Sequence, residues 1–235
     1  VAIGGSALRK LTDGPSNVAI GINSLESLTT GDRNIAVGMS SSTGYDTEND
    51  NLAIGHSALA GSVAGGEYNV AINAGTAITT GGNNTIIGEE AGITLTAGSN
   101  NVAVGMEALK NENDHGKNVA VGTQALFTQD AGADAQNTAV GYQAGGSITT
   151  AQASTLIGSL SGDAITTGNF NIAVGKEALS GNTEGASNIA IGVQSNFAAD
   201  TESNNLAIGQ AALGSSVAGA EYSIAIGNLS LDSLT

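Results

Sequence analysis

The sequence has no cysteine and no tryptophan, a single proline and only six basic residues. Without cysteine, disulfides and thiolate metal sites are excluded. Aromatic residues make up 3% of the chain, so a core has to be built from Ala, Val, Ile and Leu. No apolar run approaches the roughly 18 residues that span a bilayer. We therefore expect no membrane insertion in this stretch.

The shortage of basic residues also limits the partners. Six Lys and Arg against 21 Asp and Glu give a formal net charge of −15. Phosphate binding requires a basic footprint, so we expect no nucleic-acid partner. We expect no cofactor either, although an acidic surface attracts divalent cations. Glu89, Glu90 and Glu107 fall in adjacent repeats, where a small acidic patch could hold a cation such as calcium.

Glycine is abundant, with 35 residues, and much of it marks an internal repeat. The block Asn-Val-Ala-Ile-Gly at residues 17–21 returns about every seventeen residues along the whole chain. Fixed periods of this length are the signature of repeat architectures. The fourteen register positions, one of which carries Asn in place of Gly, are Gly4, Gly21, Gly38, Gly55, Asn73, Gly88, Gly105, Gly122, Gly141, Gly158, Gly175, Gly192, Gly209 and Gly227.

Each column of the repeat has a narrow composition. Ile or Val always precedes the register position, and Ala stands two places before it except at Ile86 and Leu156. Asn four places before can bond to the copies above and below, so we interpret this column as a structural ladder along the array. Its members are Asn17, Asn34, Asn51, Asn69, Asn84, Asn101, Asn118, Asn137, Asn171, Asn188 and Asn205.

A five-residue block rich in Val and Ile and closed by Gly is too short for a helix and fits a strand. The rest of each unit is rich in Gly, Thr, Asp and Asn, which favour turns. Seventeen residues have room for two short strands and two turns. The sequence predicts an all-β fold, a parallel β-solenoid of about 14 coils of about 17 residues, stacked about 4.8 Å apart. Residues 1–235 would form one elongated domain, a rod roughly 65 Å long.

The two faces of the block allow two arrangements. Strand alternation puts Asn, Ala and Gly on one face and the two aliphatic residues on the other. If the small face lies inside a narrow coil, the Val/Ile face forms an outward stripe too large to leave wet, and other copies of the chain would bury it in a cyclic oligomer, here a homotrimer. If Val and Ile lie inside, the chain is a monomer. We expect the oligomer.

A second, longer repeat is superimposed on the seventeen-residue repeat. Gly4 maps onto Gly158 and Asn73 onto Gly227, a shift of 154 residues, so 4–157 is repeated from 158. Neither end has a distinct capping segment, although solenoids need capped ends. We expect this stretch to be part of a longer fibre whose caps lie elsewhere, or whose rods join end to end.

The block Asn-Val-Ala-Ile-Gly, followed by two residues and Ala-Leu, resembles the head repeats of trimeric autotransporter adhesins, the YadA-like heads. The run at 137–144, Asn-Thr-Ala-Val-Gly-Tyr-Gln-Ala, is similar to phage tail-fibre shafts. The resemblance covers nearly the whole chain. It implies a left-handed parallel β-roll, three chains around one axis, and a role in surface attachment. The units here are longer than those of the family heads, so the outer turns are larger.

The sequence offers no catalytic constellation. His56 and His115 occupy different places in their repeats, and no Cys is available as a nucleophile. Recognition is expected where the regularity breaks. The longest unit, between Gly122 and Gly141, carries Phe127, Asp130 and Asp134. Aromatic residues suited to glycan or protein contact, or to covering a coil edge, share one place in the repeat: Tyr68, Phe170 and Tyr222.

Together these features predict a non-enzymatic structural or adhesive fibre segment, extracellular and exposed on a cell or virion surface. It would hold or form a receptor-binding surface, with a host glycan or a surface protein as partner besides its own copies. The alternatives are a phage tail-fibre shaft and a self-assembling extracellular filament without a receptor of its own. A polysaccharide-cleaving β-helix is a further alternative, which a clustered pair of acids on consecutive coils would favour.

Overall fold

The computed structural model describes residues 1–61, 65–74, 78–198, 200–215, 219 and 221–232. The chain divides into two compact units, Val1–Gly116 (unit 1) and Lys117–Thr235 (unit 2). Unit 1 contains the strands β1 (Ala2–Ile3), β2 (Val18–Ile20), β3 (Ile35–Val37), β4 (Leu52–Ile54), β5 (Val70–Ile72), β6 (Thr85–Ile87) and β7 (Val102–Val104). Unit 2 contains β8 (Val119–Val121), β9 (Thr138–Val140), β10 (Thr155–Ile157), β11 (Ile172–Val174), β12 (Ile189–Ile191), β13 (Leu206–Ile208) and β14 (Ile224–Ile226).

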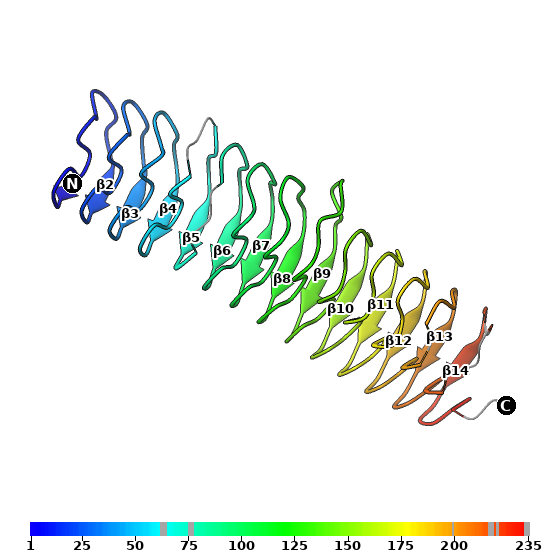
Figure 1. The fold of residues 1–235 in the computed structure, drawn as a ribbon. Helices are drawn as coiled ribbons and strands as arrows, with labels where there is room; N and C mark the ends of the chain where they lie inside the picture. The colour runs from blue at the N-terminus through cyan, green and yellow to red at the C-terminus, as the bar shows by residue number, and fades with distance from the viewer. Residues whose placement is uncertain (62–64, 75–77, 199, 216–218, 220, 233–235) are drawn as a thin grey trace. The chain divides into compact units, whose positions relative to one another are not determined.

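Both units are parallel β-solenoids, which confirms the predicted fold class. Within each unit the strands pair in chain order and in parallel, so that equivalent residues of successive coils lie side by side (Figure 1). Val18 is in register with Ile35 in unit 1, and Ile172 with Ile189 in unit 2. No helix in the described part of the chain is long and apolar enough to span a bilayer.

The expectation of two strands per coil is wrong for the residues that the structure describes, where each coil has one strand of two or three residues. The rest of the coil is a succession of turns that still bond to the next coil. The Leu25 N–H donates to the Ser41 carbonyl at 3.0 Å, and the Thr29 N–H to the Asp46 carbonyl at 2.7 Å. The other walls are therefore held by hydrogen bonds between stacked turns, without the extended dihedral angles of a strand.

The small face of the block lies inside, as in the first of the two arrangements above. The middle residue of every strand from β2 to β14 is buried, and it is Ala in most of them. Leu residues four places after the register position, such as Leu25 and Leu179, close the core from the next wall. The first and third strand residues face outward and are only partly covered. Each coil is thus narrow, with Ala against Leu at its centre.

The register glycine makes this narrow stacking feasible. Gly175 has a φ of +136°, and a Cβ there would lie 2.4 Å from the Gly192 carbonyl oxygen. Only glycine adopts this region without strain and lets the next backbone approach so closely. Asn73 replaces the glycine once, and its φ is +51°, the left-handed helical region that Asn tolerates. Asn73 also begins the shortest coil of the repeat.

Candidate functional site

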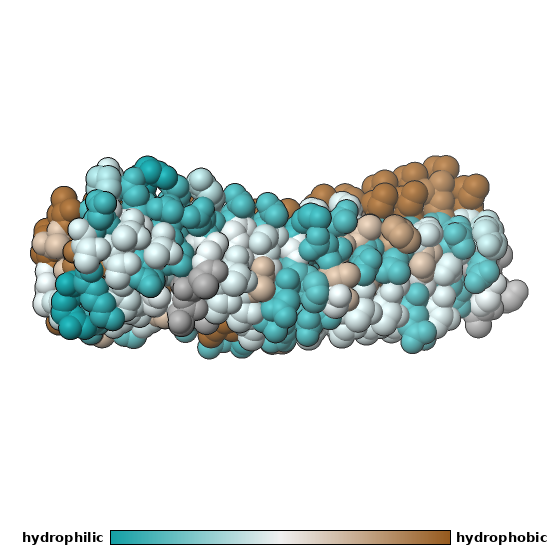
Figure 2. Space-filling view, turned by 90° about the horizontal axis from the view of Figure 1, so that it is seen from above, coloured by the Kyte–Doolittle hydropathy of each residue, from teal (hydrophilic) through white to brown (hydrophobic). Residues whose placement is uncertain are grey.

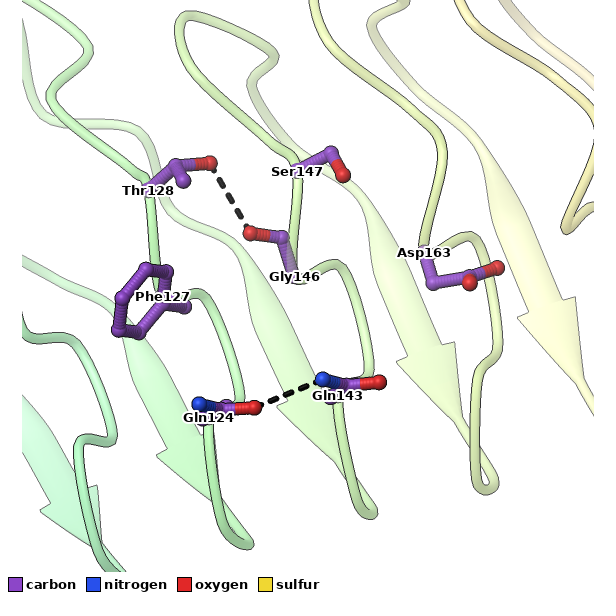
Figure 3. A pocket seen from close by; sticks show the side chains of 7 residues that line it. All are labelled: Gln124, Phe127, Thr128, Gln143, Gly146, Ser147 and Asp163. Atoms are coloured by element: carbon purple, nitrogen blue, oxygen red, sulfur yellow. Dashed lines mark hydrogen bonds between the residues drawn. The ribbon is translucent and has the colours of Figure 1, made fainter.

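A hollow of about 300 Å³ opens on the surface of unit 2. Its lining comes from three successive coils, those that begin at Gly122, Gly141 and Gly158 (Figure 3). The residues that line it are Gln124, Phe127, Thr128, Gln143, Gly146, Ser147 and Asp163. Four of these side chains are polar uncharged, one is aromatic and one is acidic, so the hollow combines an apolar wall with polar groups.

The hollow exists because one side chain is missing from a column. Phe127, Gly146 and Asp163 all stand five places after their register glycines. Phe127 and Asp163 flank the gap, and Gly146 between them contributes only backbone (Figure 3). A Cβ built at Gly146 would meet the Gln143 carbonyl oxygen at 3.3 Å. A larger side chain at this position would therefore grow into the open space with little adjustment.

Hydrogen bonds between coils hold the polar wall in place. The Gln143 Nε2 donates to Gln124 Oε1 at 2.7 Å, and the Gln143 oxygen points toward the coil of Asp163 (Figure 3). On the other side, the single O–H of Thr128 has two carbonyl acceptors within reach, Gly146 at 3.0 Å and Ile148 at 2.9 Å. The two amides and the hydroxyl are thus oriented before any ligand arrives, which lowers the entropic cost of binding.

Asp163 has the most perturbed environment of the lining residues. Its Oδ1 is shielded from solvent and has no hydrogen-bond partner among the described residues. Burial raises the pKa of this carboxyl, backbone N–H groups oppose the shift, and the negative charge of Glu177 adds to it. Figure 3 shows this carboxylate turned away from Gly146, so Asp163 lies at the edge of the hollow as an acidic group.

The structure separates the three residues expected to act together in the longest coil. Phe127 lines the hollow, whereas Asp130 and Asp134 are exposed and are not part of its lining. The Asp134 carboxylate pairs with the Lys117 ammonium at 2.6 Å. The Asp130 N–H donates to the Thr149 carbonyl at 3.0 Å. The extra residues of this coil therefore extend a loop instead of widening the site.

Tyr68, Phe170 and Tyr222 share a conformation as well as a place in the repeat. Each has a φ between +55° and +60°, in the left-handed region. Their exposed fractions are 56%, 62% and 74%. They belong to different coils, one in unit 1 and two in unit 2, so each projects as a single aromatic group. Their role in recognition remains a prediction.

The acidic patch predicted in unit 1 carries its own cation. Glu89, Glu90, Met106 and Glu107 line a hollow of about 200 Å³. The Lys110 ammonium lies 2.6 Å from the Glu107 carboxylate and 2.7 Å from that of Glu90. The hydrogen bonds that the ammonium donates, first to Glu107 and then to Glu90, raise the pKa of Lys110. This ammonium neutralises part of the patch, which weakens the attraction for calcium.

The Asn column is buried along its whole length, with 0–5% exposure. Its bonds run mainly to the backbone. The Asn17 Oδ1 accepts the N–H of Asn34 at 2.8 Å, and the Asn34 Nδ2 donates to the Glu48 carbonyl at 2.6 Å in the turn of the next coil. In unit 2 the Asn171 Oδ1 accepts the N–H of Asn188 at 2.9 Å. Each amide thus ties a strand to the neighbouring coil, because the turn carbonyls lie closer to its Nδ2 than the next amide does.

The outward strand face is the second candidate site. In unit 2 twelve of its fourteen positions are Val, Ile or Leu, and two are Thr. Ile157, Ile172 and Ile191 are 41%, 37% and 40% exposed. Because the strands are in parallel register, these side chains form continuous rows. Figure 2 shows apolar residues gathered along one edge of unit 2.

The length of its coil marks Phe127 in the sequence, whereas no such signal marks Gln124, Gln143, Ser147 and Asp163. A different signal was present, since the column that holds Phe127 and Asp163 has glycine between them. Reading it requires knowledge that this column faces outward at a corner of the coil. The Val/Ile face, by contrast, follows directly from strand alternation.

The fold defines the chain as a repeat protein of the parallel β-solenoid class. Comparison with known protein families, with curated proteins and with solved structures gives no significant match. The site's own geometry therefore carries the functional argument.

Proposed function

We propose that this chain is a structural and adhesive segment of an extracellular fibre on a cell or virion surface, and that it works as a homotrimer. The observation that carries the proposal is the outward Val/Ile face. Soluble monomers rarely expose contiguous apolar patches larger than a few hundred Å². The third strand residue is Val or Ile in every strand of unit 2, which makes one unbroken row, and no charged residue interrupts the strands.

A second copy of the same chain is the partner that this face fits best. Strands with apolar residues on both faces are typical of parallel sheets that are covered on both sides. Homo-oligomers close by rotational symmetry, which lets each chain present the same face to a shared axis. The resemblance to trimeric adhesin heads and to phage tail-fibre shafts favours three chains. Fibre segments of this kind hold a binding surface at a distance from their carrier.

Light scattering behind size exclusion tests the assembly. We expect a native mass of three times the chain mass of 22.9 kDa. Ile191→Asp places a charge in the outward rows and should shift the mass to that of the monomer, because a buried unpaired charge is costly. Ser187→Asp adds the same charge at an exposed turn of the same coil and should leave the trimer intact. A wild-type monomer would refute the proposal, whereas open polymers would favour the filament.

A further inference from the structure

We propose that the hollow between Phe127 and Asp163 is a binding site for one residue of a neutral saccharide. The inference goes beyond the proposed fibre function, because all seven lining residues come from one chain and the site does not require the trimer. A volume of about 300 Å³ lies at the lower end of the about 300–1,000 Å³ typical of ligand pockets, which limits the occupant to a small ring.

The polar groups select a ligand that donates hydrogen bonds. The Asp163 carboxylate lines the hollow as an acceptor, although its Oδ1 is shielded from solvent. The Gln143 oxygen, a second acceptor, points toward the same coil (Figure 3). Ser147 adds an exposed hydroxyl that can donate or accept. Adjacent sugar hydroxyls, each a donor and an acceptor, match such a set.

The aromatic wall selects a ring with an apolar face. Phe127 is half-buried at one side of the hollow, opposite Asp163 (Figure 3). A pyranose presents C–H groups on one face and hydroxyls at its edge, so one face can pack on Phe127 while the edge reaches Gln143 and Ser147. Aromatic side chains supply large contact area at low entropic cost.

Charge argues against an anionic sugar. None of the seven lining residues is basic, and Glu177 adds negative potential at Asp163. An acidic saccharide would therefore meet like charge without a counter-ion. The oriented amides distinguish this hollow from the acidic patch of unit 1, where Lys110 already lies between the carboxylates.

Saturation-transfer difference NMR on the full chain tests the site with four probes, one at a time: methyl α-glucoside, methyl α-mannoside, methyl β-galactoside and N-acetylglucosamine. We expect transfer to at least one of them, strongest at the ring protons of one face. Gly146→Leu fills the hollow and should abolish the transfer. Gly5→Leu is the control, because it makes the same change where a Cβ meets nothing within 4 Å. This variant should retain the saturation transfer.

Two outcomes would overturn the proposal: no transfer to any probe with the wild-type chain, or transfer that persists in Gly146→Leu. Circular dichroism tests whether Gly146→Leu is folded. If Gly146→Leu does not fold, Phe127→Ala takes its place, because it removes the aromatic wall and should itself abolish the transfer. The native mass of each variant is measured in parallel, so a loss of sugar binding with unchanged mass separates this site from the proposed assembly.

Discussion

Two of the kinds of coil in this chain build the core in opposite ways. In the regular kind a small strand residue faces a large one, as Ala173 does with Leu179 six places later. In the other kind the large residue is on the strand, at Ile86 and Leu156, and glycine takes the place of Leu at Gly92 and Gly162. A Cβ at Gly92 would lie 3.3 Å from Ile86 Cδ1, and one at Gly162 would lie 2.8 Å from Leu156 Cδ2.

In the coils of Ile86 and Leu156, the core conserves volume and not residue identity. The two exceptions in the Ala column are paired with glycines at the position that otherwise carries Leu in many coils. The backbone does not change, because Gly92 has a φ of +50° and Leu109, the equivalent residue of the next coil, has +51°. Volume-conserving exchanges are the ones that cores tolerate best.

Leu156→Ala should have the largest effect. Its neighbours Gly145 and Gly162 have no side chains that could fill the space, so the cavity stays open. We expect a loss of about 2–5 kcal/mol in the free energy of unfolding, measured by urea unfolding followed by circular dichroism. Thr155→Ala, on the outward face of the same strand, is the control and should change little. An unchanged urea midpoint for Leu156→Ala would contradict the volume argument.

Gly92→Leu should cost about 1–3 kcal/mol, because it overpacks a filled core. The φ of +50° is one that Leu accepts elsewhere in the array, so the cost comes from the contact with Ile86 and not from the backbone. The same urea experiment measures it. Gly92→Ala, whose Cβ meets Ile86 at 3.3 Å, should lie between wild type and Gly92→Leu. Equal stability of the three proteins would show that the core has spare room.

A double variant tests whether the two positions share one volume. Ile86→Ala with Gly92→Leu recreates the pair found at Ala103 and Leu109 in the next coil. We expect the double variant to lie within about 1.5 kcal/mol of wild type, although each single change is destabilising. The double-mutant cycle then yields a favourable coupling energy. Additive losses would mean that the two positions do not share one volume.

The strand and its register could be predicted from the repeat alone, whereas the repeat left two choices for the buried face. The conformation of the Leu column could not. Leu25 has a φ of +49°, a region that L residues other than Asn and Asp seldom adopt. A rule that assigns positive φ to glycine finds Gly21 and misses Leu25, because burial of the Leu side chain offsets the backbone strain. That cost is set by tertiary packing, which no local pattern encodes.

The candidate site was predictable to the same limited extent. Phe127 was found because its coil is longer than the others, but Asp163 lies two coils later in a regular one. What joins them is the missing side chain at Gly146 (Figure 3). A repeat pattern draws attention to the side chains that occupy a column. The hollow depends on what is absent between two occupied positions, and on which wall of the coil faces water.

The smallest expected effect concerns the carboxyl group of Asp163, which follows Gly162 in the coil of Leu156. Burial raises the pKa of Asp163, so folding favours its protonated form. The group therefore contributes stability below its unfolded-state pKa of about 3.9, and this contribution is lost as the pH rises through the folded-state value. Asp163→Asn should raise the urea midpoint at about pH 7 and not at about pH 3. Glu184→Gln, an exposed change of the same charge, controls for the general relief of a net −15. An equal gain in both variants would assign the effect to net charge and not to the environment of Asp163.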